Sequence, residues 1–240
     1  MTDPLVLFSH SDPPGRDPRI EEQLDVLNND YSRSDLLFQL AGTTRIENEE
    51  WFNITSGSTQ ETDMKTSLRV GDAGILNIYT VGEAYGDGDS VLGYATFPDE
   101  YEANPALDGV VLLYTTFPGG SLAPYNLGRT LTHEIGHWVG LYHTFQGGCN
   151  GDGDLIDDTP AEAAATYGCP TTNPDTCSGE GHDRKSTFMC SPSGSVTYLR
   201  SLPAIYNFMD YTDDSCMDNF TPGQIIRLQE QTSEYRGIRT

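Results

Sequence analysis

The sequence predicts an α+β fold, with a twisted mixed sheet and helices in the first half and an irregular second half that ends in one helix. Before residue 140, helical and strand patterns alternate along the chain, which is typical of a sheet covered by helices. From residue 147 to about residue 203 there is little hydrophobic periodicity. A last helical pattern starts near residue 221 and closes the chain.

Each predicted element has a local signal. In the first helix, Ile20, Leu24 and Leu27 share one face. Residues 109–116 are apolar throughout, so we expect a central strand covered on both faces. In the last helix, Thr221 is the expected N-cap, with Pro at the first position and Gln three residues after the cap. The other predicted elements are helices over 63–70 and 126–140 and strands over 36–46, 74–81 and 93–97.

Composition and charge exclude several classes of function. The 240 residues are 36% apolar, which is enough to bury a core. There are 36 acidic residues against 13 Lys and Arg, a formal net charge of −23. Because nucleic acids and anionic membranes attract clustered Lys and Arg, we expect neither as a partner. The chain as given contains no run of roughly 18 apolar residues, as a membrane span needs, and it does not open with a signal peptide.

Five cysteines bear on the cellular compartment, and all of them lie in the irregular second half. No pair has CxxC spacing, which excludes a cysteine zinc ribbon. Because a loop-rich segment buries little surface, we interpret four cysteines as two disulfides with one left over. The alternative is five free thiols in a cytosolic protein. The cysteines are Cys149, Cys169, Cys177, Cys190 and Cys216.

Three of the five histidines fall within one stretch of eleven residues, HEIGHWVGLYH. His133 and His137 are four residues apart, so on a helix they share a face and can bind one ion. His143 can reach the same ion only if the helix breaks at Gly140 and the chain turns back. Three ligands with an open fourth position are typical of a catalytic zinc site. A structural three-histidine site is the alternative, and it would give Glu134 no role.

The motif and its surroundings resemble a known family. HExxHxxGxxH is the signature of metzincin metallopeptidases. Three further segments narrow the resemblance to the pappalysin family, and in particular to its small secreted fungal members. The first segment is Thr144-Phe145-Gln146-Gly147-Gly148-Cys149, directly after the third histidine, and the second is Asp158-Thr159-Pro160. The third is Asn207-Phe208-Met209-Asp210-Tyr211 with the following Asp214-Ser215-Cys216-Met217. The resemblance covers roughly residues 20–235 and implies a metzincin-like catalytic domain.

The resemblance implies a role for individual residues. It places the zinc ligands at His133, His137 and His143, the general base at Glu134, and the methionine of the Met-turn at Met209. Tyr211 matches a tyrosine that helps to hold the transition-state oxyanion. It also implies the pairs Cys149–Cys177 and Cys169–Cys216, which leaves Cys190 unpaired. The expected reaction is hydrolysis of peptide bonds in proteins by a zinc-activated water, with the substrate extended along an edge strand, for which residues 93–97 are our candidate.

The resemblance also shapes the expected domain organisation. Residues 1–16 would be an N-terminal extension, and residues 17–240 one catalytic domain. Within it we expect an upper subdomain over about 17–140, a lower one over about 141–240, and an inserted loop over 184–204. We expect a secreted monomer, in a mature or truncated form, that acts on protein or peptide substrates. Since no cysteine precedes the domain, no thiol from within this chain can block the zinc.

A second cation site is predicted from an acidic loop. Residues 150–159 pack four aspartates among glycines, and oxygen ligands on a flexible loop suit calcium. The candidate ligands are Asp152, Asp154, Asp158 and Thr159; the alternative is a solvated acidic turn. Two more acidic residues, Asp213 and Asp214, follow the Met-turn segment. The resemblance implies that this segment forms a wall of the pocket for the residue just after the scissile bond, so we expect a preference for Arg or Lys there.

Two other functions use the same residues. One is a zinc- and calcium-dependent binding module without catalysis, although every catalytic position holds the required residue type. The other is a metal-dependent hydrolase of non-peptide bonds.

The segment over 184–204 separates the Met-turn from the preceding loop and carries the odd cysteine. Arg184-Lys185-Ser186 can be encoded by C|GT-AAG-TCN and Pro203-Ala204 by CCA-G|CN, which are splice-site sequences. Excision would join Asp183 through one proline to Ile205, the pattern of the resembled family. We therefore expect either a retained intron translated in frame or a native surface loop with a free thiol.

Overall fold

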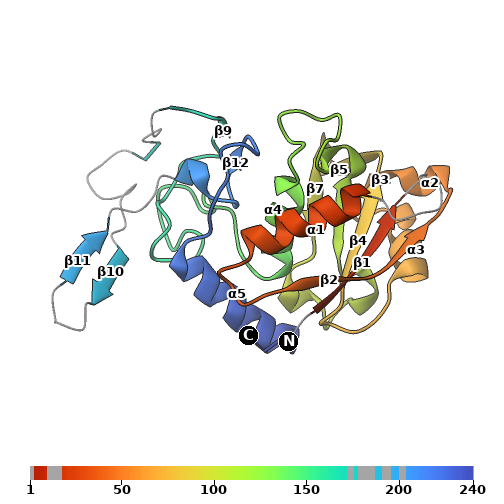
Figure 1. Cartoon of the computed structure of the whole chain (residues 1–240), viewed down its shortest axis with the longest axis horizontal. Helices are drawn as coiled ribbons and strands as arrows, with labels where there is room; N and C mark the ends of the chain where they lie inside the picture. The colour runs from red at the N-terminus through yellow and green to blue at the C-terminus, as the bar shows by residue number, and fades with distance from the viewer. Residues whose placement is uncertain are drawn as a thin grey trace. The chain divides into compact units, whose positions relative to one another are not determined.

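The computed structural model describes residues 3–9, 18–171, 176–177, 187–190, 196–199 and 204–239 (Figure 1). For residues 3–9, 187–190 and 196–199 it describes the backbone alone. The chain forms two compact units, one of residues 1–140 with 228–240 and one of residues 141–227.

A five-stranded mixed sheet organises the first unit, with strand order β2-β1-β4-β8-β7 (Figure 1). The first four strands are parallel, and β7 pairs antiparallel with β8, which makes β7 an edge strand. β8 is buried along its whole length, as its apolar sequence predicts, but it lies next to the edge. The strands are β1 (Asp3–Ser9), β2 (Phe38–Arg45), β4 (Leu76–Val81), β7 (Gly93–Ala95) and β8 (Val110–Leu113).

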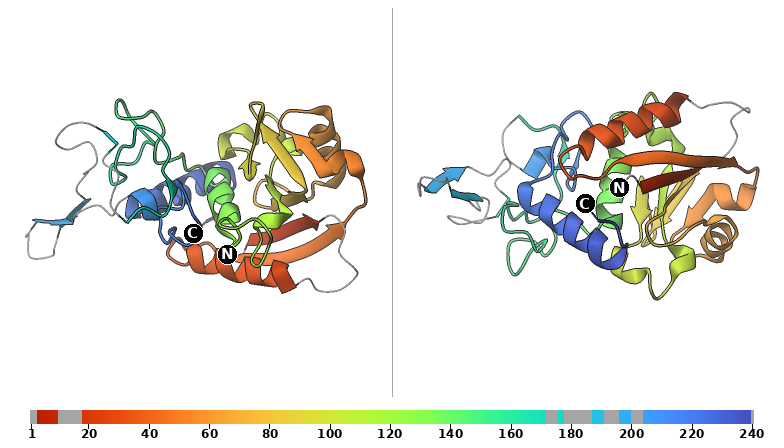
Figure 2. Two further views of the ribbon diagram at one scale, coloured as in Figure 1. Left: turned by 90° about the horizontal axis from the view of Figure 1, so that it is seen from above. Right: turned by 60° about the horizontal axis from the view of Figure 1, so that its bottom comes forward.

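Helices cover both faces of this sheet. α1 (Pro18–Asp30) and α4 (Arg129–Trp138) lie side by side (Figure 2). On the other face, Met64 of α3 (Thr59–Leu68) packs into a core cluster with Tyr79 and Val111. Successive strand residues point to opposite faces, so Tyr94 of β7 meets this cluster while Gly93 faces α4.

Most of the predicted elements are present in this unit, with some differences. α1 buries Ile20 and Leu27, but Leu24 is only half-buried because Gln23 takes the inner position and donates to the backbone oxygen of Gly128. Residues 3–9, which were expected to lie in an N-terminal extension, form β1 between β2 and β4. Short elements without a strong periodic signal went unpredicted: α2 (Glu49–Phe52) and the small sheet of β3 (Asn53–Thr55), β5 (Glu83–Gly86) and β6 (Asp89–Ser90).

The second unit has little regular structure. Its strands β9 (Tyr167–Gly168) and β12 (Tyr211–Thr212) pair in parallel. α5 (Pro222–Tyr235) begins with the predicted capping box, in which Gln224 N donates to Thr221 Oγ1 (3.1 Å) and Thr221 N to Gln224 Oε1 (2.8 Å). From Leu228 onward, α5 belongs to the first unit.

Residues 184–204 were expected to form an irregular loop, but two strands lie within this segment. β10 (Thr187–Cys190) and β11 (Val196–Leu199) form an antiparallel pair, and neither joins another sheet among the described residues. In the part of the chain that the structure describes, no helix has the length and apolar character that crossing a membrane requires.

Candidate metal centre and active site

α4 carries the histidine motif and is fixed at both ends. At its start, the hydroxyl of Tyr31 donates to the backbone oxygen of Thr132 (2.9 Å), and the Thr132 hydroxyl donates to Asp30 (2.7 Å). At its end, Gly140 has φ +97° and stops the helix, as predicted. A Cβ atom at this position would lie 2.7 Å from Gln231 Cγ, so both the turn and the packing require glycine.

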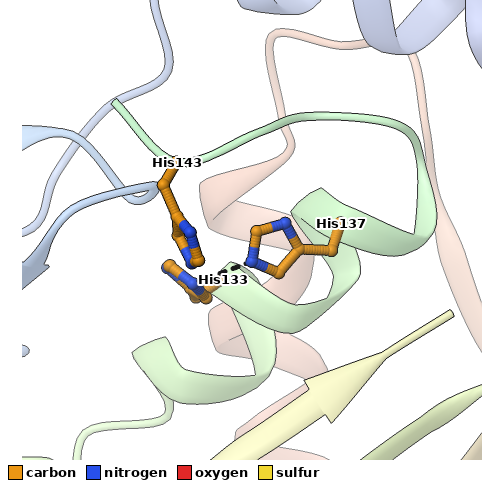
Figure 3. Close-up of side chains that lie close together, drawn as sticks. All are labelled: His133, His137 and His143. Atoms are coloured by element: carbon orange, nitrogen blue, oxygen red, sulfur yellow. Dashed lines mark hydrogen bonds between the residues drawn. The ribbon is translucent and has the colours of Figure 1, made fainter. Parts of the chain in front are cut away.

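The structure brings the three motif histidines together (Figure 3). Their candidate ligand nitrogens all lie within 4.8 Å of one another, and the Nε2 atoms of His133 and His137 are 3.1 Å apart. Two nitrogens bound about 2.0–2.1 Å from one tetrahedral zinc ion would be about 3.3 Å apart. The distance between His133 and His137 matches this value, and a set of three imidazoles is a donor set that suits zinc.

Aromatic side chains surround the histidine rings. The hydroxyl of Tyr211 lies 3.1 Å from His143 Nε2, and the two rings pack edge to face. The ring of Phe145 stacks on His143 and contacts Tyr211. The ring of Phe97, two residues after the end of β7, lies 5.3 Å from the ring of His137 in α4. Such contacts limit the orientation of an imidazole, which a metal site requires.

Glu134 is the buried acidic residue of the motif, only 6% exposed. Burial raises the pKa of its carboxyl to about 8, because the charged form loses solvation. A carboxyl group in such an environment is poised to exchange a proton near neutral pH.

The segment identified as the Met-turn is buried and tied to its surroundings. Met209 is fully buried, and its backbone oxygen accepts from Thr144 N (3.2 Å), next to His143. Asn207 and Gln224 exchange two amide hydrogen bonds of 2.7 and 2.9 Å, which hold the turn to the start of α5. The turn thus supports the segment that carries the third histidine.

Two buried carboxyl groups lie close to this segment, and neither is among the predicted site residues. Glu162 accepts from the hydroxyl of Thr144 (2.8 Å). Asp210 accepts from Thr166 N (3.0 Å) through Oδ1, whereas Oδ2 is buried with no hydrogen-bond partner among the described residues. Burial raises the pKa of Asp210 to about 6. In the sequence, the one signal for Asp210 is its position in the Asn207–Tyr211 motif.

The two implied disulfides are present, Cys149–Cys177 and Cys169–Cys216. Cys190 lies in β10, whose side chains are outside the described part of the structure, so its unpaired state stays a prediction. In the acidic loop, the Thr159 hydroxyl lies within 2.7 Å of both carboxylate oxygens of Asp154.

The other predicted calcium ligands do not converge on this pair. Asp152 is exposed, and Asp158 accepts from the Thr221 hydroxyl (2.6 Å) and Gly223 N (2.9 Å) at the start of α5. Among the described residues, the three histidines are the one group of three or more His, Cys, Asp or Glu side chains placed to share an ion.

A further buried network connects the end of α4 to the end of the chain. Asp108 accepts from the Trp138 indole (3.2 Å) and forms ion pairs with Arg236 (3.0 Å) and Arg69 (3.4 Å). The Arg236 guanidinium stacks on the Trp138 ring, 3.7 Å from its centroid, and donates to the Trp138 backbone oxygen. These residues lie far apart in the sequence, and no local pattern connects them.

Comparison with known proteins shows the family. A sequence model of the peptidase family described as pregnancy-associated plasma protein-A (M43) matches residues 72–233. An extracellular metalloprotease of Pyricularia oryzae is 42% identical over 92% of this chain and 69% of its own length. One from Verticillium alfalfae is 43% identical over 92% of this chain and 70% of its own. Mature mirolysin of Tannerella forsythia, solved with a cleaved peptide, has TM-score 0.70 and 29% identity, covering 95% of this chain and 90% of that one.

The mixed sheet and the three clustered histidines define a metzincin-type zinc metallopeptidase. Within this class the chain belongs to the pappalysin family, M43, and it is a metalloendopeptidase. The resemblance and the α+β fold that the sequence indicated are thereby confirmed.

Proposed function

We propose that the protein is a secreted zinc-dependent endopeptidase in which His133, His137 and His143 hold the zinc ion and Glu134 is the general base. The convergence of the three histidines carries the proposal. The relatives' description as extracellular metalloproteases, together with the two disulfides, supports secretion.

The zinc ion, when bound, supplies a Lewis acid that activates water and polarises the substrate carbonyl. Glu134 takes a proton from the attacking water and delivers it to the leaving amine. A neighbouring cation favours the ionised form of this carboxyl group, which burial otherwise disfavours. Tyr211, whose hydroxyl points at His143, donates a hydrogen bond to the oxyanion that develops from the carbonyl.

The substrate would lie extended along the free edge of β7. Among the strands that the structure describes, β7 pairs with β8 alone, so the backbone groups on its other side can pair with a peptide. Mirolysin, which shares the fold, has been solved with a cleaved peptide.

Three finer features remain proposals. We infer a preference for Arg or Lys after the scissile bond from Asp213 and Asp214, of which Asp214 is buried at 3% exposure. Peptide-library profiling with a large apolar preference there would reject it. Calcium would be bound by the acidic loop through Asp152, Asp154, Asp158 and Thr159, of which Asp154 and Thr159 are in contact. The monomer expected from the sequence is to be checked by size-exclusion chromatography.

Casein hydrolysis tests the proposed mechanism. We expect 1,10-phenanthroline to abolish it, and Glu134→Gln to lower kcat by roughly 10²–10⁴-fold with zinc content unchanged, because proton transfer is lost. Glu50→Gln, an exposed glutamate on α2, is the matched control and should behave as wild type. Full activity of the Glu134→Gln variant would refute the role of this residue.

A further inference from the structure

The first residue of β7 lies against the side chain of Glu134. A Cβ atom built on Gly93 would lie 3.0 Å from Glu134 Cγ. It would also lie 2.9 Å from the backbone oxygen of Val111 and 3.1 Å from Leu112 Cβ, both in β8. Carbon atoms in contact are normally about 3.5–4.0 Å apart. No side chain therefore fits between β7 and α4 at this position without a shift of its neighbours.

The requirement for glycine here is one of space. Gly140 needs glycine partly because its φ is positive, whereas the backbone of Gly93 is outside the left-handed region. At Gly93 the absent side chain lets α4 approach the edge strand closely enough for the aliphatic stem of Glu134 to rest on it.

This contact bears directly on where the carboxylate lies. The first side-chain torsion of Glu134 places Cγ, and only a few staggered values of it are open in a helix. With Cγ resting on the backbone of Gly93, rotation toward β7 is blocked. The Cγ atom, from which the carboxylate extends, is then bounded by the helix on one side and by the strand on the other.

We propose that Gly93 is a positioning residue for Glu134, an inference that rests on the proposed role of Glu134 as general base. The contact sets the base relative to β7, the strand along which the substrate would lie. At the other end of the same segment, Phe97 packs on His137. Gly93 of β7 and Phe97, which follows the strand, thus contact two residues of the proposed active site.

Gly93→Ala in the zinc-loaded full chain tests the proposal by kinetics. The Val111 oxygen is part of the β8 backbone, whereas Glu134 Cγ is in a side chain, so Glu134 is expected to move. We expect kcat to fall about tenfold or more, since a displacement of about 1 Å can cost ~10²-fold, while KM stays within about twofold. Gly42→Ala is the matched control: it lies on β2 of the same sheet, and a Cβ there meets nothing within 4 Å.

Zinc content, measured by metal analysis, should stay at the wild-type level in both variants. An unchanged kcat in Gly93→Ala would overturn the proposal, because Gly93 would then have no effect on the position of Glu134. A raised KM with normal kcat would also overturn it, because Gly93 would then affect substrate binding and not the chemical step.

Thermal unfolding gives a second test that does not depend on activity. If the inserted Cβ clashes with Glu134, the loss of Tm caused by Gly93→Ala should be clearly smaller in a Glu134→Ala background. An equal loss in both backgrounds would assign the clash to β8 alone and overturn the proposal. Should Gly93→Ala fail to fold, folding of the double variant supports the contact, and failure of both variants opposes it.

These tests separate the two proposals. Activity in Glu134→Gln would refute the general base, yet the unfolding experiment would still show whether Gly93 and Glu134 are coupled.

Discussion

At the scale of single residues, the candidate site combines a local motif with long-range partners. His133, Glu134 and His137 share one helix, so their proximity follows from helical geometry. Tyr211 reaches His143 from a strand 68 residues further along the chain. Its hydroxyl lies 3.1 Å from Nε2 of the His143 imidazole, and this contact leads to a specific expectation.

Tyr211→Phe should lower kcat by about 10²-fold with little change in KM, because one oxyanion donor is removed. The fluorogenic cleavage of a peptide measures both constants. Tyr167→Phe removes the hydroxyl of the neighbouring ring, 5.9 Å away and 67% exposed, and serves as control. Loss of zinc from the Tyr211→Phe variant would contradict this role and assign the hydroxyl to holding His143.

Asp210 gives a prediction about pH. Its pKa is raised from 3.8 to about 6, so the folded protein holds this proton more tightly than the unfolded chain. The resulting stability is fully present below about pH 4 and is lost as the pH rises through about 6. Asp210→Asn cannot ionise, so relative to wild type it should gain on the order of 3 kcal/mol between pH 4 and pH 7.

Urea unfolding of metal-free protein at a series of pH values measures this difference and avoids the effect of metal loss. Asp213→Asn, close by in the sequence, is the control. A variant whose stability runs parallel to that of wild type over this range would show that Asp210 does not titrate there.

At the scale of elements, the sequence predicted those with strong local signals. α1, α4 and the capped start of α5 lie where periodicity, glycine and capping residues indicated. The sequence did not predict which strands pair with each other. β7 is the edge strand because, among the described strands, it pairs with β8 alone, and this depends on the order and register of the whole sheet. Residues 3–9 carry a short apolar run, and only their two neighbouring strands make them part of the sheet.

The hairpin of β10 and β11 pairs with no other described strand, which gives a prediction about residues 184–204. Replacing them with a single proline should leave Tm and kcat close to wild type. The proline would take the place of Ala204, at the start of a short 3₁₀ helix (Ala204–Tyr206), a position that suits proline.

Mass spectrometry of the native secreted protein distinguishes the two origins of the segment. An Asp183-Pro-Ile205 junction would establish the retained intron. A peptide spanning residues 186–200 in active enzyme would refute it and establish a native surface segment.

At the scale of the whole molecule, the end of the chain returns to the first unit. Residues 228–240 belong to the same unit as α4, and Arg236 pairs there with the buried Asp108. The ion pair is 0% exposed on both sides, so breaking it leaves charge in a poorly solvated place.

Arg236→Met should therefore destabilise the protein by about 3–5 kcal/mol in chemical unfolding. Asp108 would keep its hydrogen bonds from Trp138 and Thr96, but its ion pair with Arg69 is longer, at 3.4 Å. Arg239→Met, three residues further on and exposed, should change stability little. Equal stability of the two variants would show that the buried pair adds nothing.

The sequence by itself determined the chemistry of this protein: the spacing of His133, His137 and His143, the helix break at Gly140, and the family with its paired cysteines. The histidine spacing and the helix break are local features, and the pairing of the cysteines followed from the resemblance to the family. Only the tertiary structure decided that Gly93 supports Glu134, that Asp210 is buried with one unpaired oxygen, and that Arg236 meets Asp108. Such contacts join segments far apart in the chain, and their geometry depends on how the sheet, the helices and the loops pack together.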